Sequence, residues 1–179
     1  MNPTTKYKSN NLFIVVIHGP MGAGKTTLAD LLHDEIADTA HFGADHIKWL
    51  VSDFKNVSSH TQVAKNMIPL MVKGYLKQGI NVIVEQAFTT EEIKSLELIA
   101  QQFNAQFLVY SLDADRETLN KRIVERTQKR EKPEVPIDHI NKSYDEYKES
   151  LYEGGASFDS GKVSIREMAD KIITDLKLT

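Results

Sequence analysis

Hydrophobic and polar positions divide the chain into two kinds of segment. Continuous apolar runs are typical of buried strands, whereas apolar residues spaced three and four positions apart are typical of helices that face a core. Strand-like runs lie at 12–18, 40–44, 81–85, 107–112 and 156–159. Because helical stretches separate them, the pattern predicts a parallel sheet with helices on both faces and right-handed crossovers.

The helical stretches carry their own boundary signals. Helices are predicted at 25–37, within 64–79, from 90, from 115, at 137–151 and from 165 to near the end of the chain. Thr89 with Glu92, and Ser164 with Glu167, have the spacing of capping boxes. Pro69 interrupts the second helical region, so that helix is expected to begin or bend there.

A glycine-rich segment separates the first strand from the first helix. It reads G-P-M-G-A-G-K-T from Gly19 to Thr26, which is the P-loop pattern in its proper strand-to-helix setting. Its glycines let successive N–H groups converge on phosphate oxygens at the positive end of the helix. Lys25 is expected to reach the β- and γ-phosphates of ATP, and the Thr26 hydroxyl to ligate Mg²⁺. The predicted nucleotide site comprises Gly19, Met21, Gly22, Ala23, Gly24, Lys25, Thr26 and Thr27, together with Arg122.

Two acidic residues follow or end predicted strands, at the sheet edge where open α/β folds bind ligands. Asp45 lies just beyond the second strand. It is predicted to accept the proton of a substrate hydroxyl, with a simple helix N-cap as the alternative. Glu85 ends the third strand, where an acid holds either a metal-bound water or the substrate hydroxyl. Both readings of Glu85 stay open at this point.

Three arginines share one face of the helix that begins near residue 115. Arg122, Arg126 and Arg130 are spaced i, i+4, i+8. A solvated basic face is the plain interpretation. The charged, proline-bearing segment that follows favours a lid at about 126–137 instead, which on closing brings Arg126 and Arg130 onto the transferring phosphoryl group. His18 is expected to pack against the strand end. Trp49 and Tyr75 are expected to pack in the core, with the lining of an acceptor pocket as the alternative.

Composition limits the remaining choices. The chain has 179 residues, of which 41% are hydrophobic and 26% charged. This balance predicts one globular domain at 12–179 after a disordered tail at 1–11. The net charge of −3 gives no footprint for duplex nucleic acid. The absence of cysteine excludes thiolate chemistry, and the six histidines show no metal-ligand spacing. Without an apolar span or signal peptide, a cytoplasmic protein is expected, with no membrane partner.

These residues give the chain a family likeness. It resembles the small P-loop kinases that include chloramphenicol phosphotransferase, zeta toxins and polynucleotide kinase. The likeness rests on segments 19–27, 42–45 and 79–83, and on Arg122 and Arg126 after 112–113. It implies a three-layer P-loop NTPase fold with five parallel strands and a lid, and Asp45 as base. Asp45-His46-Ile47-Lys48 is similar to a zeta-toxin and polynucleotide-kinase pattern, which implies that Lys48 binds substrate; segment 158–161 is similar to an adenine-contacting loop.

The leading hypothesis is therefore an ATP-dependent kinase that phosphorylates a hydroxyl of a small molecule such as a nucleoside, sugar or antibiotic-like alcohol. A nucleotide kinase or 5′-hydroxyl polynucleotide kinase is the alternative, although the acidic balance disfavours long nucleic acids. A non-enzymatic switch of the GTPase kind lacks its D-x-x-G and N-K-x-D motifs. The length disfavours a motor or AAA-type ATPase with a further sensor domain. The acceptor and the oligomeric state stay open.

Overall fold

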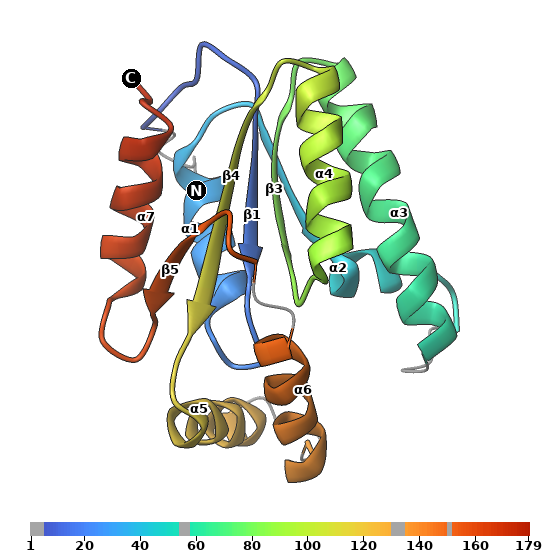
Figure 1. The fold of residues 1–179 in the computed structure, drawn as a ribbon, viewed down its shortest axis with the longest axis vertical. Helices are drawn as coiled ribbons and strands as arrows, with labels where there is room; N and C mark the ends of the chain where they lie inside the picture. The colour runs from blue at the N-terminus through green and yellow to red at the C-terminus, as the bar shows by residue number, and fades with distance from the viewer. Residues whose placement is uncertain (1–5, 54–57, 130–134, 150–151) are drawn as a thin grey trace.

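A computed structural model of the protein describes residues 6–53, 58–129, 135–149 and 152–179. Its centre is a parallel sheet of five strands in the order β2-β3-β1-β4-β5 (Figure 1). The strands are β1 Phe13–His18, β2 Thr39–Gly43, β3 Asn81–Gln86, β4 Gln106–Asp113 and β5 Ala156–Asp159. The sequence-based prediction of a five-stranded parallel sheet is confirmed.

Helices cover both faces of the sheet and one of its ends. They are α1 Lys25–Glu35, α2 Ala44–Lys48, α3 Ser58–Lys77, α4 Thr90–Gln102, α5 Arg116–Lys129, α6 Ile137–Glu149 and α7 Ile165–Asp175. In Figure 1, α1 and α7 lie on one side of the sheet and α3 and α4 on the other, while α5 and α6 lie below the carboxyl ends of the strands. The three layers therefore leave that end of the sheet for a site built by loops and by α5 and α6.

The side chains of β1 point alternately to the two faces of the sheet, and this explains why helices are needed on both faces. Phe13, Val15 and Ile17 pack in one core cluster with α1 and α7. Ile14 and Val16 pack in a second cluster with α3 and α4. Because successive side chains of a strand point to opposite faces, a strand that is apolar throughout must be covered twice.

The local signals in the sequence hold in the structure. Both predicted capping boxes form, at Thr89 with Glu92 and at Ser164 with Glu167. Helix α3 runs without a break from residue 58 to residue 77, so Pro69 lies inside it and does not start it. Within the described ranges, no helix has the length and apolar character that crossing a membrane requires.

Two expectations from the sequence are wrong. Residues 6–11 of the predicted disordered tail lie against the fold, because the N–H of Tyr7 donates to the Glu35 carbonyl and Lys8 exchanges backbone hydrogen bonds with Thr179. Residues 1–5 of that tail are outside the described residues. Trp49 is 71% exposed and Tyr75 is 38% exposed, so neither is buried in the core. Trp49 follows the five-residue helix α2, which buries only Ala44 and Ile47.

Candidate functional site

The P-loop forms one wall of a cavity at the carboxyl end of β1. Gly22 and Gly24 adopt positive φ angles of 84° and 96°, and α1 begins directly afterwards with no side chain capping it. Its first-turn N–H groups are therefore available to an anion. The cavity has a volume of about 440 Å³ and is lined by Gly22, Ala23, Gly24, Lys25, Thr26, Thr27, Arg122, Arg126, Ser160, Val163, Ser164 and Ile165.

The other two predicted P-loop positions lie behind the cavity wall. A Cβ atom on Gly19 would lie 2.3 Å from the Leu112 carbonyl oxygen, so glycine is needed there for contact with β4. The N–H of Met21 lies 3.4 Å from the Ser143 hydroxyl oxygen of α6. Gly19 and Met21 therefore shape the loop against its neighbours and do not line the cavity.

Lys25 is held by the loop itself. Its Nζ donates to the Pro20 carbonyl over 2.9 Å. Desolvation lowers the pKa of this lysine, and the nearby positive charge of Arg126 lowers it further, whereas Glu85 and Asp45 raise it. The charges of Asp45, Glu85 and Arg126 therefore all act on Lys25, the predicted phosphate-binding lysine.

Glu85 lies beside the first turn of α1. The Thr26 hydroxyl donates to its Oε1 over 3.2 Å. Glu85 is buried, and this burial raises the pKa of its carboxyl against the lowering effects of Lys25 and of the Thr26 hydrogen bond. A hydroxyl and a carboxylate side by side are hard oxygen donors of the kind that Mg²⁺ prefers, so the residues present fit that ion.

Asp45 and Lys48 form a pair on α2. Asp45 lies in the first helical turn with its side chain 78% exposed, and its Oδ1 lies 2.5 Å from Lys48 Nζ. The N-cap of α2 is Gly43, so the interpretation of Asp45 as an N-cap is wrong. Lys48 is predicted to bind substrate; in the structure its ammonium group is engaged with Asp45.

The arginines of α5 and the loop after β5 form the opposite wall. Arg122 donates to the Ser160 hydroxyl over 3.1 Å and to the Ser160 carbonyl over 2.6 Å. Arg126 lines the same cavity. Arg130, and residues 130–134 of the predicted lid at 126–137, lie outside the described residues.

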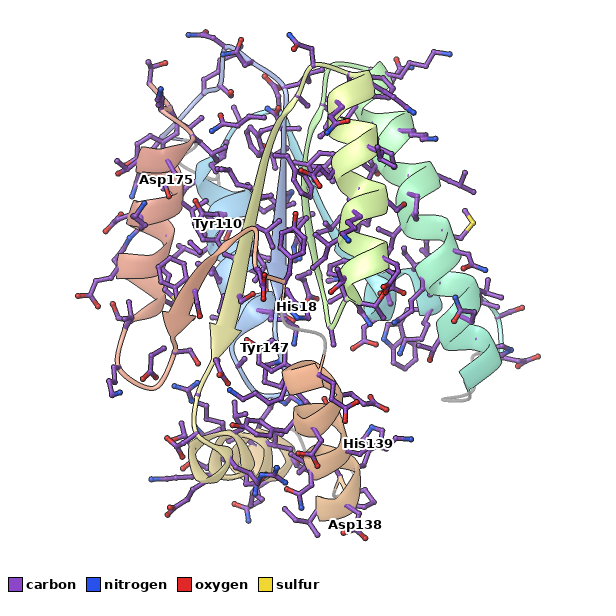
Figure 2. All side chains as sticks on the ribbon, in the orientation of Figure 1. His18, Tyr110, Asp138, His139, Tyr147 and Asp175 are labelled. Carbon is purple, nitrogen blue, oxygen red and sulfur yellow. The ribbon has the colours of Figure 1, made fainter. Side chains whose placement is uncertain are left out.

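His18 is structural in the way that the sequence predicts. It is fully buried, and its Nδ1 accepts a hydrogen bond from the Phe88 N–H over 3.0 Å. Figure 2 shows its ring at the end of β1 beside Tyr147 of α6, with the ring centroids 4.9 Å apart. Burial lowers the pKa of His18 to about 4, so it is neutral at pH 7. It connects the P-loop strand to the 86–88 segment and to α6.

Sequence reasoning missed several residues of this region. Ser143 contacts the P-loop, and no motif marks it. Ser160 lies in the segment 158–161 that resembles an adenine-contacting loop, but its contact with Arg122 is not indicated by the sequence. His41 and His46 lie near Glu85, although the histidine spacing along the chain carries no metal-binding signal. Only the register of β2 against β3, which pairs Gly43 with Glu85, brings these residues together.

This combination of a parallel sheet, a P-loop cavity and basic α5 defines a P-loop protein of the kinase-like fold. The chain belongs to the family described as AAA domain, which matches residues 14–150. The name of this family contains the label AAA, whereas the length of the chain argues against an AAA-type ATPase with a further sensor domain. No curated protein sequence matches the chain.

Solved structures show the same fold at low sequence identity. The APS kinase CysC of Mycobacterium tuberculosis, solved with AMPPNP and APS, has a TM-score of 0.67 at 16% identity, covering 93% of this chain and 98% of that one. A sugar kinase from Janibacter sp. HTCC2649 has 0.65 at 16% identity, covering 93% and 95%. The tunicamycin resistance protein of Deinococcus radiodurans has 0.64 at 17% identity, covering 94% and 97%. These likenesses establish the fold and the resemblance to P-loop kinases that the motifs predict.

Proposed function

We propose that the protein is an ATP-dependent kinase that transfers the γ-phosphate of ATP to a hydroxyl group of a small molecule. The observation that carries this proposal is the cavity that Lys25, the P-loop lysine, lines together with Arg126. Glu85 accepts a hydrogen bond from Thr26 in the same cavity wall, and the charge of Asp45 acts on Lys25. Phosphoryl transfer depends mainly on positioning and charge stabilisation, and these four groups are the charges that it needs. The kinase names of the solved structures with this fold support the same reading.

Each residue has a role in the proposed reaction. The P-loop amides and Lys25 bind the β- and γ-phosphates, and Arg122 with Ser160 closes the nucleotide side of the cavity. Thr26 and Glu85 would hold Mg²⁺, which when bound neutralises phosphate charge. This arrangement favours the metal-side role for Glu85 over contact with the substrate hydroxyl, because its carboxylate faces the Thr26 hydroxyl.

Asp45 is the proposed base. The acceptor oxygen bonds to the γ-phosphorus, the bond from that phosphorus to the bridging oxygen of ADP breaks, and the acceptor proton passes to the Asp45 carboxylate. Arg126 and Arg130 stabilise the charge on the moving phosphoryl group. The exposure of Asp45 leaves it accessible to a diffusing acceptor, and the Lys48 ammonium keeps its carboxylate in place.

ADP release with Mg-ATP tests the proposal directly. The purified protein is assayed against separate pools of nucleosides, sugars, amino alcohols, antibiotics and 5′-hydroxyl oligonucleotides. Acceptor-dependent ADP release in a small-molecule pool, absent in Lys25→Ala and kept in the exposed control Lys73→Ala, supports it. Release with oligonucleotides alone would favour the polynucleotide kinase instead. Tight ATP binding with no release in any pool would favour a nucleotide-binding regulator.

A further inference from the structure

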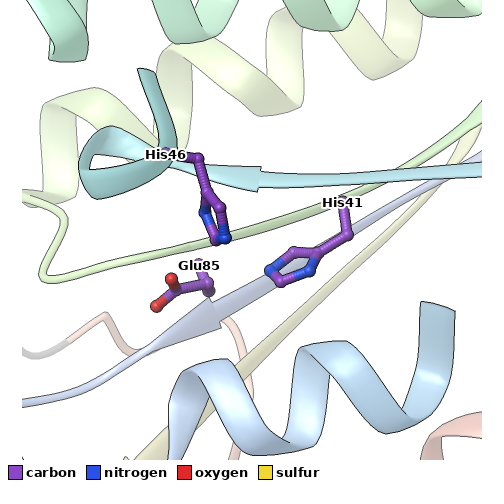
Figure 3. Close-up of side chains that lie close together, drawn as sticks. All are labelled: His41, His46 and Glu85. Atoms are coloured by element: carbon purple, nitrogen blue, oxygen red, sulfur yellow. The ribbon is translucent and has the colours of Figure 1, made fainter. Parts of the chain in front are cut away.

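Two imidazoles and a carboxylate from three separate elements meet beside the P-loop. His41 lies on β2, His46 on α2 and Glu85 on β3. One ligand atom of each lies within 4.8 Å of the other two. Figure 3 shows both rings directed towards the Glu85 carboxylate. The cause is topological, because α2 begins immediately after β2 and places His46 above the strand pair that carries His41 and Glu85.

His41 has the features of a metal-ligating histidine. Its Nε2 is buried and has no hydrogen-bond partner. Its Nδ1 lies 3.2 Å from an Asp30 carboxylate oxygen on α1, which places the ring proton on Nδ1 and leaves the Nε2 lone pair free. Metal-binding histidines commonly donate their second nitrogen to a carboxylate in this way.

His46 and Glu85 complete the donor set. His46 is exposed and gives an ion a path from solvent, whereas Glu85 is buried. The Nδ1 of His46 accepts the Gly43 N–H over 3.2 Å. Ligation through Nε2 would move the ring proton to Nδ1 and end that long hydrogen bond. Because His46 is exposed, a small rotation of its ring can bring the ligand atoms to the separation of roughly 3.4 Å required around a four-coordinate ion.

We propose that His41, His46 and Glu85 form a binding site for a divalent transition-metal ion of the Zn²⁺ class, with Asp30 orienting His41. Two imidazoles and one carboxylate suit Zn²⁺ and its first-row neighbours, whereas Mg²⁺ takes oxygen ligands. This site differs from the proposed Mg²⁺ site at Thr26 and Glu85 because it adds two imidazoles, but the two sites have Glu85 in common. An ion bound by the histidines therefore competes with the Thr26 hydroxyl for that carboxylate.

A consequence for activity follows, and it rests on the proposed kinase function. Withdrawal of Glu85 from Thr26 removes an oxygen donor from the magnesium side of the nucleotide cavity. Zn²⁺ bound at the histidine site is then an inhibitor that excess Mg²⁺ does not displace from the imidazoles.

Metal binding is tested first on protein without a histidine tag, by Zn²⁺ competition against a chromogenic chelator and by the visible absorption of Co²⁺. We expect one ion per chain, with affinity at least about ten-fold lower in His41→Ala and His46→Ala and about ten-fold lower in Asp30→Asn. His139→Ala, an exposed histidine of α6, is the matched control and keeps wild-type affinity. Far-UV circular dichroism checks that each variant is folded. The exposed position of His46 makes its variant decisive if His41→Ala does not fold.

Equal affinity in wild type and His46→Ala, or no bound ion at all, would overturn the proposal. This arm needs no kinase activity, so it stands or fails independently of the proposed function. In the second arm, Zn²⁺ is titrated into the ADP-release assay at saturating Mg²⁺. Inhibition of the wild type at concentrations that fill the site, with the midpoint shifted at least ten-fold in His46→Ala, supports the inhibitory role; an unshifted midpoint contradicts it.

Discussion

The hydroxyl of Thr26 donates a hydrogen bond to Glu85 across 59 residues of sequence. This contact joins the first turn of α1, which presents the P-loop amides, to the end of β3, which carries the buried acid. It also places an acid whose role the sequence leaves open on the side of the cavity where a P-loop threonine would ligate Mg²⁺.

Glu85→Gln is expected to raise the Mg²⁺ concentration needed for half-maximal ADP release by about 10- to 100-fold. The amide keeps the size of the side chain and removes the negative charge beside Thr26. A Mg²⁺ titration of the acceptor-dependent rate measures the effect, with the exposed Glu117→Gln as control. An unchanged Mg²⁺ midpoint would show that the carboxylate does not serve the metal.

Lys25→Ala is expected to reduce transfer by at least about 100-fold, the loss typical when a preorganised charge is removed from a transition state. The alanine variant also frees the Pro20 carbonyl that Nζ contacts, so folding is checked by thermal unfolding. Calorimetric titration with a non-hydrolysable ATP analogue separates lost binding from lost chemistry. Retained transfer would remove this lysine from the mechanism.

Asp45→Asn is expected to lower turnover by about 10²- to 10⁴-fold, as loss of a general base does, with ATP affinity largely kept. Its ion pair with Lys48 is exposed on the Asp45 side, so stability should change by less than about 1 kcal/mol. Steady-state kinetics with the acceptor found in the screen measure this, and substitution of the exposed Asp138 of α6, Asp138→Asn, is the control. Transfer at the wild-type rate would refute the assignment of Asp45 as base.

Acid should destabilise the protein through His18. Its pKa is about 4 when folded and 6.5 in the unfolded chain, so the unfolded state binds more protons between these values. The contribution of neutral His18 to the free energy of unfolding is complete above about pH 7 and declines as the pH falls through 6.5 towards 4. Urea unfolding at pH 7.5 and pH 5.0 should show a loss of roughly 2 kcal/mol from this group. In His18→Gln the pH dependence should be flatter by that amount, and in His139→Gln unchanged.

Gly22→Ala should destabilise the fold by about 1–2 kcal/mol, because an L-residue is strained at its positive φ. The new methyl would also lie 3.0 Å from Cγ1 of Ile123 on α5. Gly74→Ala is the matched control: this glycine lies in α3, a methyl group added to it would meet nothing within 4 Å, and the substitution should stabilise by about 0.5–1 kcal/mol. Urea unfolding distinguishes them, and equal effects of the two substitutions would contradict the strain argument.

Much of the fold follows from the sequence because its signals are local. The bounds of β5 at 156–159 and the two capping boxes are correct, since apolar runs and capping spacings depend on neighbouring residues alone. The P-loop cavity is also foreseeable, because its glycines, lysine and threonine are contiguous. Trp49 shows the limit of local reading: its size favours burial, but the shortness of α2 leaves it on the surface.

The features that sequence reasoning missed depend on register and on distant pairing. Ser160 meets Arg122 only because α5 lies across the end of the sheet from the loop after β5. His41 approaches Glu85 because β2 pairs with β3 in one particular register, and a shift of one residue would turn His41 to the opposite face. The spacing of residues along the chain indicates neither the Ser160–Arg122 contact nor the approach of His41 to Glu85.

The pairing of Lys8 with Thr179 has a practical consequence for handling the molecule. Both N–H groups of this pair donate to the partner's carbonyl, and Figure 1 shows the carboxyl terminus at the opposite end of the sheet from α5 and α6. A tether attached to Thr179 would hold the protein with its nucleotide cavity directed away from the support. Immobilisation through that end therefore offers a way to record binding on a sensor surface with the mouth of the cavity unobstructed.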